Sequence, residues 1–225
     1  MAHELDRAVT ISPSRLQPWV DGFRRRHGDL QVSLEGEHVV VVAADGAEAQ
    51  IAIPFPPLPV SAAPPDGSAA PPGSTVLESL IRHVAVERPI GALLVRKGGF
   101  AVGVFEGPRL LASKVGSAYV QGKTKAGGWS QQRYARRRDN QSRKAYGEAA
   151  DEAVRVLLPH LGRLQRVATG GDKPAVAAVL ADARLAELRP LVLPEVYPVP
   201  DPRLRVLQAF PEQFLALRIR LNALA

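Results

Sequence analysis

A proline-rich stretch in the first third of the chain restricts the possible folds more than any other sequence feature. Residues 54–73 contain eight prolines in twenty positions, with Ala, Ser and Gly around them. Proline lacks a backbone N–H and has a fixed φ, so such a run cannot form the interior of a helix or a sheet. This composition is typical of a semi-extended linker, and docking through a proline motif is the alternative. We therefore predict a domain over 1–53, a linker over 54–73 and a second domain over 74–225.

The first domain has the pattern of a small α+β unit. Leu16, Trp19, Val20 and Phe23 recur with the spacing of one helix face, which predicts a helix over 15–27 and favours core packing of Trp19 and Phe23 over base stacking. A short apolar run predicts a strand before this helix, and three more predict strands after it. The predicted strands are 8–11, 31–34, 38–42 and 47–53.

The second domain has an α/β pattern. Apolar runs separated by glycine-containing turns predict a strand meander, and a long helix starts near Ser130 and ends before Pro159, which corresponds to roughly 45 Å. Further alternation of strand and helix predicts a mixed sheet. The expected strands are 89–95, 100–105, 110–120, 164–168 and 191–193, and the expected helical segments are 173–183 and 201–221.

The net charge of +7 is concentrated in one segment. Residues 123–144 contain eight of the 29 Lys and Arg residues and one of the 22 acidic residues, so the rest of the chain is balanced. Like charges at this density repel each other, which indicates a polyanionic partner. Guanidinium groups fit phosphate oxygens, so we predict RNA binding by this segment. The predicted RNA-binding residues are Lys123, Lys125, Trp129, Arg133, Arg136, Arg137, Arg138, Arg143 and Lys144.

Composition also excludes several classes of site. The chain has no cysteine, so it has neither disulfides nor thiolate metal ligands, which favours a cytoplasmic location. The N-terminus resembles no signal peptide, and no apolar run is long enough for a membrane span. The histidines lack metal-ligand spacing and are expected at the surface or at edges: His3, His27, His38, His83 and His160. No metal, cofactor, membrane or DNA is therefore expected.

The loop before the long helix combines residues suited to hydrolysis of an activated carbonyl. Gly127 and Gly128 give the backbone freedom, Trp129 either stacks on a base or folds back, and Gln131 and Gln132 begin the basic helix. A glutamine amide has no useful pKa, but it can orient a water molecule and donate hydrogen bonds to an oxyanion. The alternative is that these glutamines are ordinary solvent-facing residues.

This segment resembles the catalytic loop and helix of the Vms-like release factors, including their single-chain actinobacterial branch. The resemblance covers Lys123 to Gln141, and it implies an RNase H-like second domain that hydrolyses peptidyl-tRNA at the peptidyl-transferase centre of the large ribosomal subunit. The family motif, a glycine, two variable residues and a catalytic glutamine, corresponds here to Gly128 and Gln131, and Gln132 is the alternative.

The resemblance also limits the expected function. Ordinary release factors have the glutamine directly after two glycines, whereas Trp129 and Ser130 intervene here, so release of stalled chains fits better than stop-codon termination. A monomer is expected. A non-catalytic ribosome- or RNA-binding factor is the main alternative, and a ribonuclease is less favoured because Asp139 is the only acid in the basic segment.

Overall fold

The computed structural model describes residues 5–60, 74–117 and 130–225, with backbone alone for residue 74 and residues 130–142. The chain divides into two compact units, each with its own sheet and core. Unit 1 comprises residues 1–87 and 215–225, and unit 2 comprises residues 88–214. Unit 2 is therefore inserted into the sequence of unit 1. The mixed α/β class predicted from the sequence is confirmed, whereas the RNase H-like designation stays a prediction.

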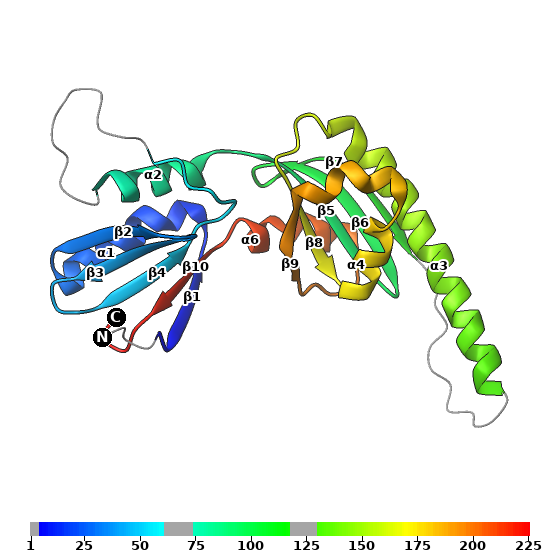
Figure 1. Cartoon of the computed structure of the whole chain (residues 1–225), viewed down its shortest axis with the longest axis horizontal. Helices are drawn as coiled ribbons and strands as arrows, with labels where there is room; N and C mark the ends of the chain where they lie inside the picture. The colour runs from blue at the N-terminus through cyan, green and yellow to red at the C-terminus, as the bar shows by residue number, and fades with distance from the viewer. Residues whose placement is uncertain (1–4, 61–73, 118–129) are drawn as a thin grey trace. The chain divides into compact units, whose positions relative to one another are not determined.

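Unit 1 is a five-stranded antiparallel sheet with helices on one face (Figure 1). The strands occur in the order β1-β10-β4-β3-β2, and the buried side chains of the sheet pack with Leu16, Val20 and Phe23 of the first helix and with Leu77 and Leu80 of the second. The elements are β1 (Arg7–Ile11), η1 (Pro13–Arg15), α1 (Leu16–His27), β2 (Leu30–Glu35), β3 (His38–Ala43), β4 (Glu48–Ala52), α2 (Ser74–Ala85) and β10 (Leu217–Leu221).

Trp19 and Phe23 pack as core residues, as predicted. Phe23 is buried, and its ring stacks on that of Trp19 with 5.2 Å between centroids. His83 differs from the expected surface position, because it is only 6% exposed and its Nε2 donates a hydrogen bond to the carbonyl oxygen of Pro54 at 2.8 Å. This bond ties α2 to the start of the proline-rich segment.

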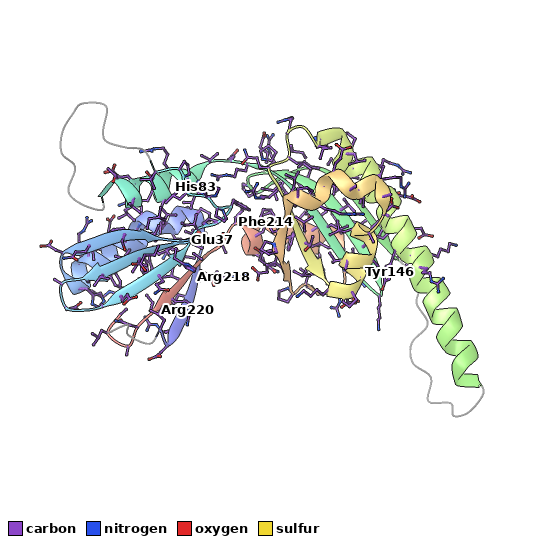
Figure 2. All side chains as sticks on the ribbon, viewed as in Figure 1. Glu37, His83, Tyr146, Phe214, Arg218 and Arg220 are labelled. Carbon is purple, nitrogen blue, oxygen red and sulfur yellow. The ribbon has the colours of Figure 1, made fainter. Side chains whose placement is uncertain are left out.

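The predicted domain limits do not coincide with the two units. Helix α2, absent from the prediction, packs on the core of unit 1, so the proline-rich segment connects two elements within unit 1. The C-terminal part was also expected to be helical as far as residue 221. It contains only two short helices, and residues 217–221 form β10, in which buried Leu217, Ile219 and Leu221 alternate with exposed Arg218 and Arg220 (Figure 2).

Unit 2 contains a five-stranded mixed sheet in the order β7-β6-β5-β8-β9. Strands β5, β6 and β7 are antiparallel neighbours, whereas β8 is parallel to β5 and β9 is parallel to β8. The elements are β5 (Pro89–Arg96), β6 (Gly99–Glu106), β7 (Arg109–Ser117), α3 (Ser130–Leu157), η2 (Leu158–His160), β8 (Arg166–Gly171), α4 (Lys173–Leu180), η3 (Ala183–Leu191), β9 (Val192–Tyr197), α5 (Leu204–Ala209) and α6 (Pro211–Phe214).

Side chains from helices cover both faces of this sheet. Leu93, Val102 and Val167 belong to the core that α3, α4 and η3 form on one face. On the other face the ring of Phe105 packs edge-on against Phe214, with 5.7 Å between centroids. Coverage on both faces explains why β5 and β6 are almost continuously buried.

Candidate functional site

Helix α3 has a C-terminal half that is fixed to the sheet. Ala145, Ala149, Ala153 and Leu157 are buried and follow each other at four-residue spacing. The small alanine side chains allow the helix to lie close to the strands, and Leu157 fits beside Gly91, where a Cβ atom would lie 3.2 Å from its Cδ2. The sheet of unit 2 therefore determines the direction of the whole helix.

The N-terminal half of α3 extends beyond the sheet (Figure 1). The change occurs near Tyr146, which is half-buried on α3 (Figure 2). One turn earlier, Arg143 and Lys144 are exposed. The Lys144 side chain is 82% exposed, and its ammonium forms a long ion pair of 4.0 Å with Glu148. Such an exposed pair contributes little, so both cations remain available to a ligand.

The structure places part of the predicted site on this helix. Gln131 and Gln132 are the second and third residues of α3, in its first turn, and the backbone of the arginine run is helical. The side chains of residues 130–142 are not described. These include Gln131, Gln132, Arg133, Arg136, Arg137 and Arg138, whereas Lys123, Lys125, Gly127, Gly128 and Trp129 lie outside the described residues altogether. The catalytic arrangement therefore stays a prediction.

The charge distribution along α3 opposes the helix dipole. The N-terminus of a helix carries a partial positive charge, yet α3 has no acid in its first turn and Arg133 follows immediately. Arg133 and Arg137 also lie four positions apart, where like charges destabilise a helix. A bound polyanion would relieve both effects, and the N-terminus of a helix commonly binds anions.

Arg184 joins the fixed half of α3 to the helical segment η3. Its Nη2 atom donates to Asp151 Oδ1 on α3 at 2.7 Å and to Asp182 Oδ2 at 2.8 Å. The guanidinium and backbone N–H of Arg184 both bind the Asp182 carboxylate, which lowers the pKa of Asp182 from 3.8 to about 2. This bridge adds a polar attachment to the apolar packing of α3.

The carboxyl ends of four strands meet at one end of the sheet in unit 2. Strands β5, β7, β8 and β9 all run toward this end, as the pairing directions require. We call it the carboxyl end. β7 stops there at Ser117, paired with Gly99, before the segment that precedes α3. The turn between β5 and β6 and the segment after β8 meet at the same end, since the Asp172 N–H donates to Val95 O at 2.8 Å.

Five cations at the carboxyl end were not predicted as a group from the sequence. Arg96, Lys97, Lys173, Arg203 and Arg205 are separated by up to 109 positions, so no local charge run marks them. The segment after β9 joins the group because Arg96 Nη1 donates to Val199 O at 3.1 Å. Only the pairing of strands distant in sequence brings these residues together.

The described residues offer neither a metal-binding cluster nor a membrane span. Among the side chains described, no group of three or more His, Asp or Glu residues could hold a metal ion. Within the same part of the chain, no helix combines the length and apolarity needed to cross a membrane.

Comparison with known proteins places the chain among release factors. It is 33% identical over 101 residues to peptide chain release factor subunit 1 of Pyrococcus abyssi and 32% identical to that of Thermococcus onnurineus, which covers 44% of this chain and 24% of each relative. The match thus spans about a quarter of these relatives. The chain belongs to the Actinobacteria/chloroflexi VLRF1 release factor family, which it matches over residues 88–220, all of unit 2 and most of β10. The resemblance found in the sequence is therefore confirmed.

Two solved structures are similar at low sequence identity. The crystal structure of archaeal translation termination factor aRF1 is 15% identical, with a TM-score of 0.40, and the alignment covers 92% of this chain and 66% of that chain. The structure of S. cerevisiae Dom34, a translation termination-like factor, is 7% identical, with a TM-score of 0.36 and coverage of 92% and 65%.

Proposed function

We propose that this protein is a peptidyl-tRNA hydrolase that acts on the ribosome and releases stalled nascent chains. Gln131 orients the water molecule that attacks the ester between peptide and tRNA, and Gly128 gives the loop the freedom to approach that ester. The basic residues of segment 123–144 bind ribosomal RNA and tRNA phosphates. Membership of the VLRF1 release factor family supports a role in translation termination or rescue.

One observation carries the proposal: Gln131 lies in the first turn of a helix whose other half is fixed to a folded domain. A polar group on a rigid helix that extends beyond its domain can reach a site enclosed by RNA. The helix has 28 residues, which corresponds to about 42 Å at 1.5 Å per residue. The sheet of unit 2 then serves as the support that determines where the glutamine lies.

The expected chemistry is electrostatic rather than acid–base. The glutamine amide is neutral at all relevant pH values, so it contributes by holding the water and by donating to the developing oxyanion. Removal of one such donor typically costs roughly 100- to 1,000-fold in rate. The arginines remain protonated and bind phosphates, and they take no part in making or breaking bonds.

A non-catalytic ribosome-binding factor is the second candidate. The positive charge of segment 123–144 supports it, because RNA binding requires this charge but no catalytic glutamine. The basic segment would bind RNA equally well in such a factor. The two candidates therefore differ in peptide release and agree in binding.

The test is single-turnover peptide release from purified large subunits that carry peptidyl-tRNA, at matched occupancy of the protein. We expect Gln131→Ala to lose release about 100-fold or more while binding is retained. Gln132→Ala tests the neighbouring residue, and Gln141→Ala, further along the same helix, is the matched control. Unchanged release in both Gln131→Ala and Gln132→Ala contradicts the mechanism. Tight binding by the wild type without any release favours the non-catalytic factor.

A further inference from the structure

We infer that the carboxyl end of the sheet in unit 2 is a second RNA-binding surface, centred on a cleft that Arg203 and Arg205 line. This inference rests on the proposed function, since it extends the RNA contact from α3 to the domain that supports it. The surface consists of Arg96, Lys97, Lys173, Arg203 and Arg205. It lies outside the basic segment 123–144 in the sequence.

Hydrogen bonds and packing bring these residues to one place. Arg96 forms an ion pair of 3.6 Å with Asp172, whose other oxygen accepts a hydrogen bond from the Lys97 N–H at 3.3 Å. Lys173 directly follows Asp172. Asp201 lies beside the same turn, because a Cβ atom on Gly98 would be 3.6 Å from its Oδ1. The segment that leads into Arg203 is thereby held against the β5–β6 turn.

The charge of this surface is positive and largely uncompensated. Lys97, Lys173, Arg203 and Arg205 are exposed, and none of them forms an ion pair with a carboxylate in the described parts of the chain. Of the acids beside the β5–β6 turn, Asp172 is already occupied by Arg96 and the Lys97 N–H. Four cations of this surface therefore have no carboxylate partner in the described parts of the chain, which is the balance expected of a surface that binds an anion.

Arg203 and Arg205 line a cleft that could accommodate part of a ligand. It has a volume of about 540 Å³ and is lined by Pro200, Asp201, Arg203, Arg205, Val206, Ala209 and Gln213. The guanidinium groups can bind phosphate oxygens in a fork, and the Gln213 amide can bind a ribose or base edge. Pro200, Val206 and Ala209 provide an apolar wall of the kind that faces a sugar or a base.

The occupant is an RNA backbone rather than a small nucleotide. A small ligand is usually buried for most of its surface, whereas Arg203 and Arg205 are both exposed. The carboxyl end is also the end at which β7 leads into the basic segment before α3. Ligands of open α/β sheets commonly bind at the carboxyl ends of strands. We therefore expect an RNA that binds the basic half of α3 to contact this surface as well.

The experiment measures binding of the full-length protein to large ribosomal subunits between about 50 and 200 mM salt. The double substitution Arg203→Gln with Arg205→Gln removes two positive charges. It should weaken binding about five- to tenfold and reduce the slope of log affinity against log salt concentration by about one to two. The matched control is Arg24→Gln with Arg26→Gln, which removes two exposed arginines from α1 of unit 1. We expect this control to bind like the wild type, and Arg203→Lys with Arg205→Lys to retain most of the affinity.

The outcomes separate this surface from the proposed activity. If the variant with Arg203→Gln and Arg205→Gln binds large subunits like the α1 control, the proposal of a second RNA-binding surface is wrong. This conclusion does not depend on what Gln131→Ala does to peptide release. If the double substitution weakens binding while the wild type releases no peptide, the surface stands and the hydrolase proposal fails. Adenosine monophosphate is the competitor that tests the occupant. If it abolishes the difference in subunit binding between the wild type and this variant, the cleft is a mononucleotide site and the RNA assignment is overturned.

Discussion

At the scale of single residues, two glycines of unit 2 lie in opposite environments, one crowded and one open. Gly171 ends β8 with φ of +106°, and a Cβ atom there would lie 2.1 Å from the carbonyl oxygen of Val95. Gly147 lies within α3, where a Cβ atom would meet nothing within 4 Å. Gly171 is therefore required by a close backbone approach at the carboxyl end, whereas Gly147 only weakens the helix that carries the candidate site.

Replacing each glycine with alanine should change the free energy of unfolding in opposite directions. Gly147→Ala should stabilise the protein by about 1 kcal/mol, because alanine favours the helix and the space is open. Gly171→Ala should destabilise it by roughly 1–3 kcal/mol, because the backbone must move to accept the methyl group. Urea unfolding of both variants measures the difference. A loss of stability in Gly147→Ala would contradict the open environment around that residue.

At the scale of elements, the Arg184 bridge predicts a pH dependence for the attachment of α3. The carboxylate of Asp182 has a pKa lowered to about 2 in the folded chain, against 3.8 ordinarily. The folded state therefore resists protonation of Asp182, and the stability that this carboxylate contributes is present above about pH 4 and is lost as the pH falls toward 2.

The measurement is the free energy of unfolding of wild type and Asp182→Asn across this acid range. We expect the wild type to lose stability more steeply, since asparagine has no proton to gain. Asp182→Asn should also loosen η3, because the Asp182 carboxylate accepts a hydrogen bond from the Arg184 N–H at 2.9 Å and an amide oxygen is a weaker acceptor. Equal acid slopes in the two proteins would show that the bridge does not stabilise the folded state.

The sequence predicted some of these elements well and others poorly. Helix α3 was predicted to within about a residue, because Ala145, Ala149, Ala153 and Leu157 repeat at helical spacing over several turns. β10 was mistaken for part of a helical region, since its alternation of Leu, Ile and Arg covers only five residues. Its partners at Arg7–Ile11 are more than 200 positions away. No local pattern reports such a pairing.

The candidate site shows the same division. The basic segment and its glutamines are contiguous, so a local charge run and a motif predict them. Lys97, Lys173 and Arg203 come together only through the sheet, and each is an ordinary surface cation in the sequence. The parallel pairing of β5 with β8, which brings Val95 opposite Gly171, places Lys97 near Lys173. Arg203 joins them because Asp201 lies beside Gly98.

At the scale of the whole molecule, the insertion of unit 2 makes unit 1 depend on the last residues of the chain. β10 lies between β1 and β4, so it is the link that joins β1 to the sheet. Asn222 secures it: its Oδ1 accepts from Glu48 N at 3.1 Å, and its Nδ2 donates to Gly46 O at 2.9 Å. Unit 1 can therefore complete its sheet only after unit 2 has been synthesised.

Deleting residues 215–225 should accordingly unfold unit 1 and leave unit 2 folded. Leu217, Ile219 and Leu221 are at most 3% exposed, and burial of each contributes about 1.5–3 kcal/mol. Their joint loss is comparable to the whole stability of a small unit, about 5–15 kcal/mol. Unit 2 should remain folded because its core includes no side chain from β10.

Hydrogen exchange resolved by segment measures both units at once. Asn222→Ala is a milder variant that should lower the free energy of unfolding by roughly 1–3 kcal/mol in unit 1 alone. Persistent protection of β3 and β4 in the deletion would show that unit 1 is stable without its C-terminal strand.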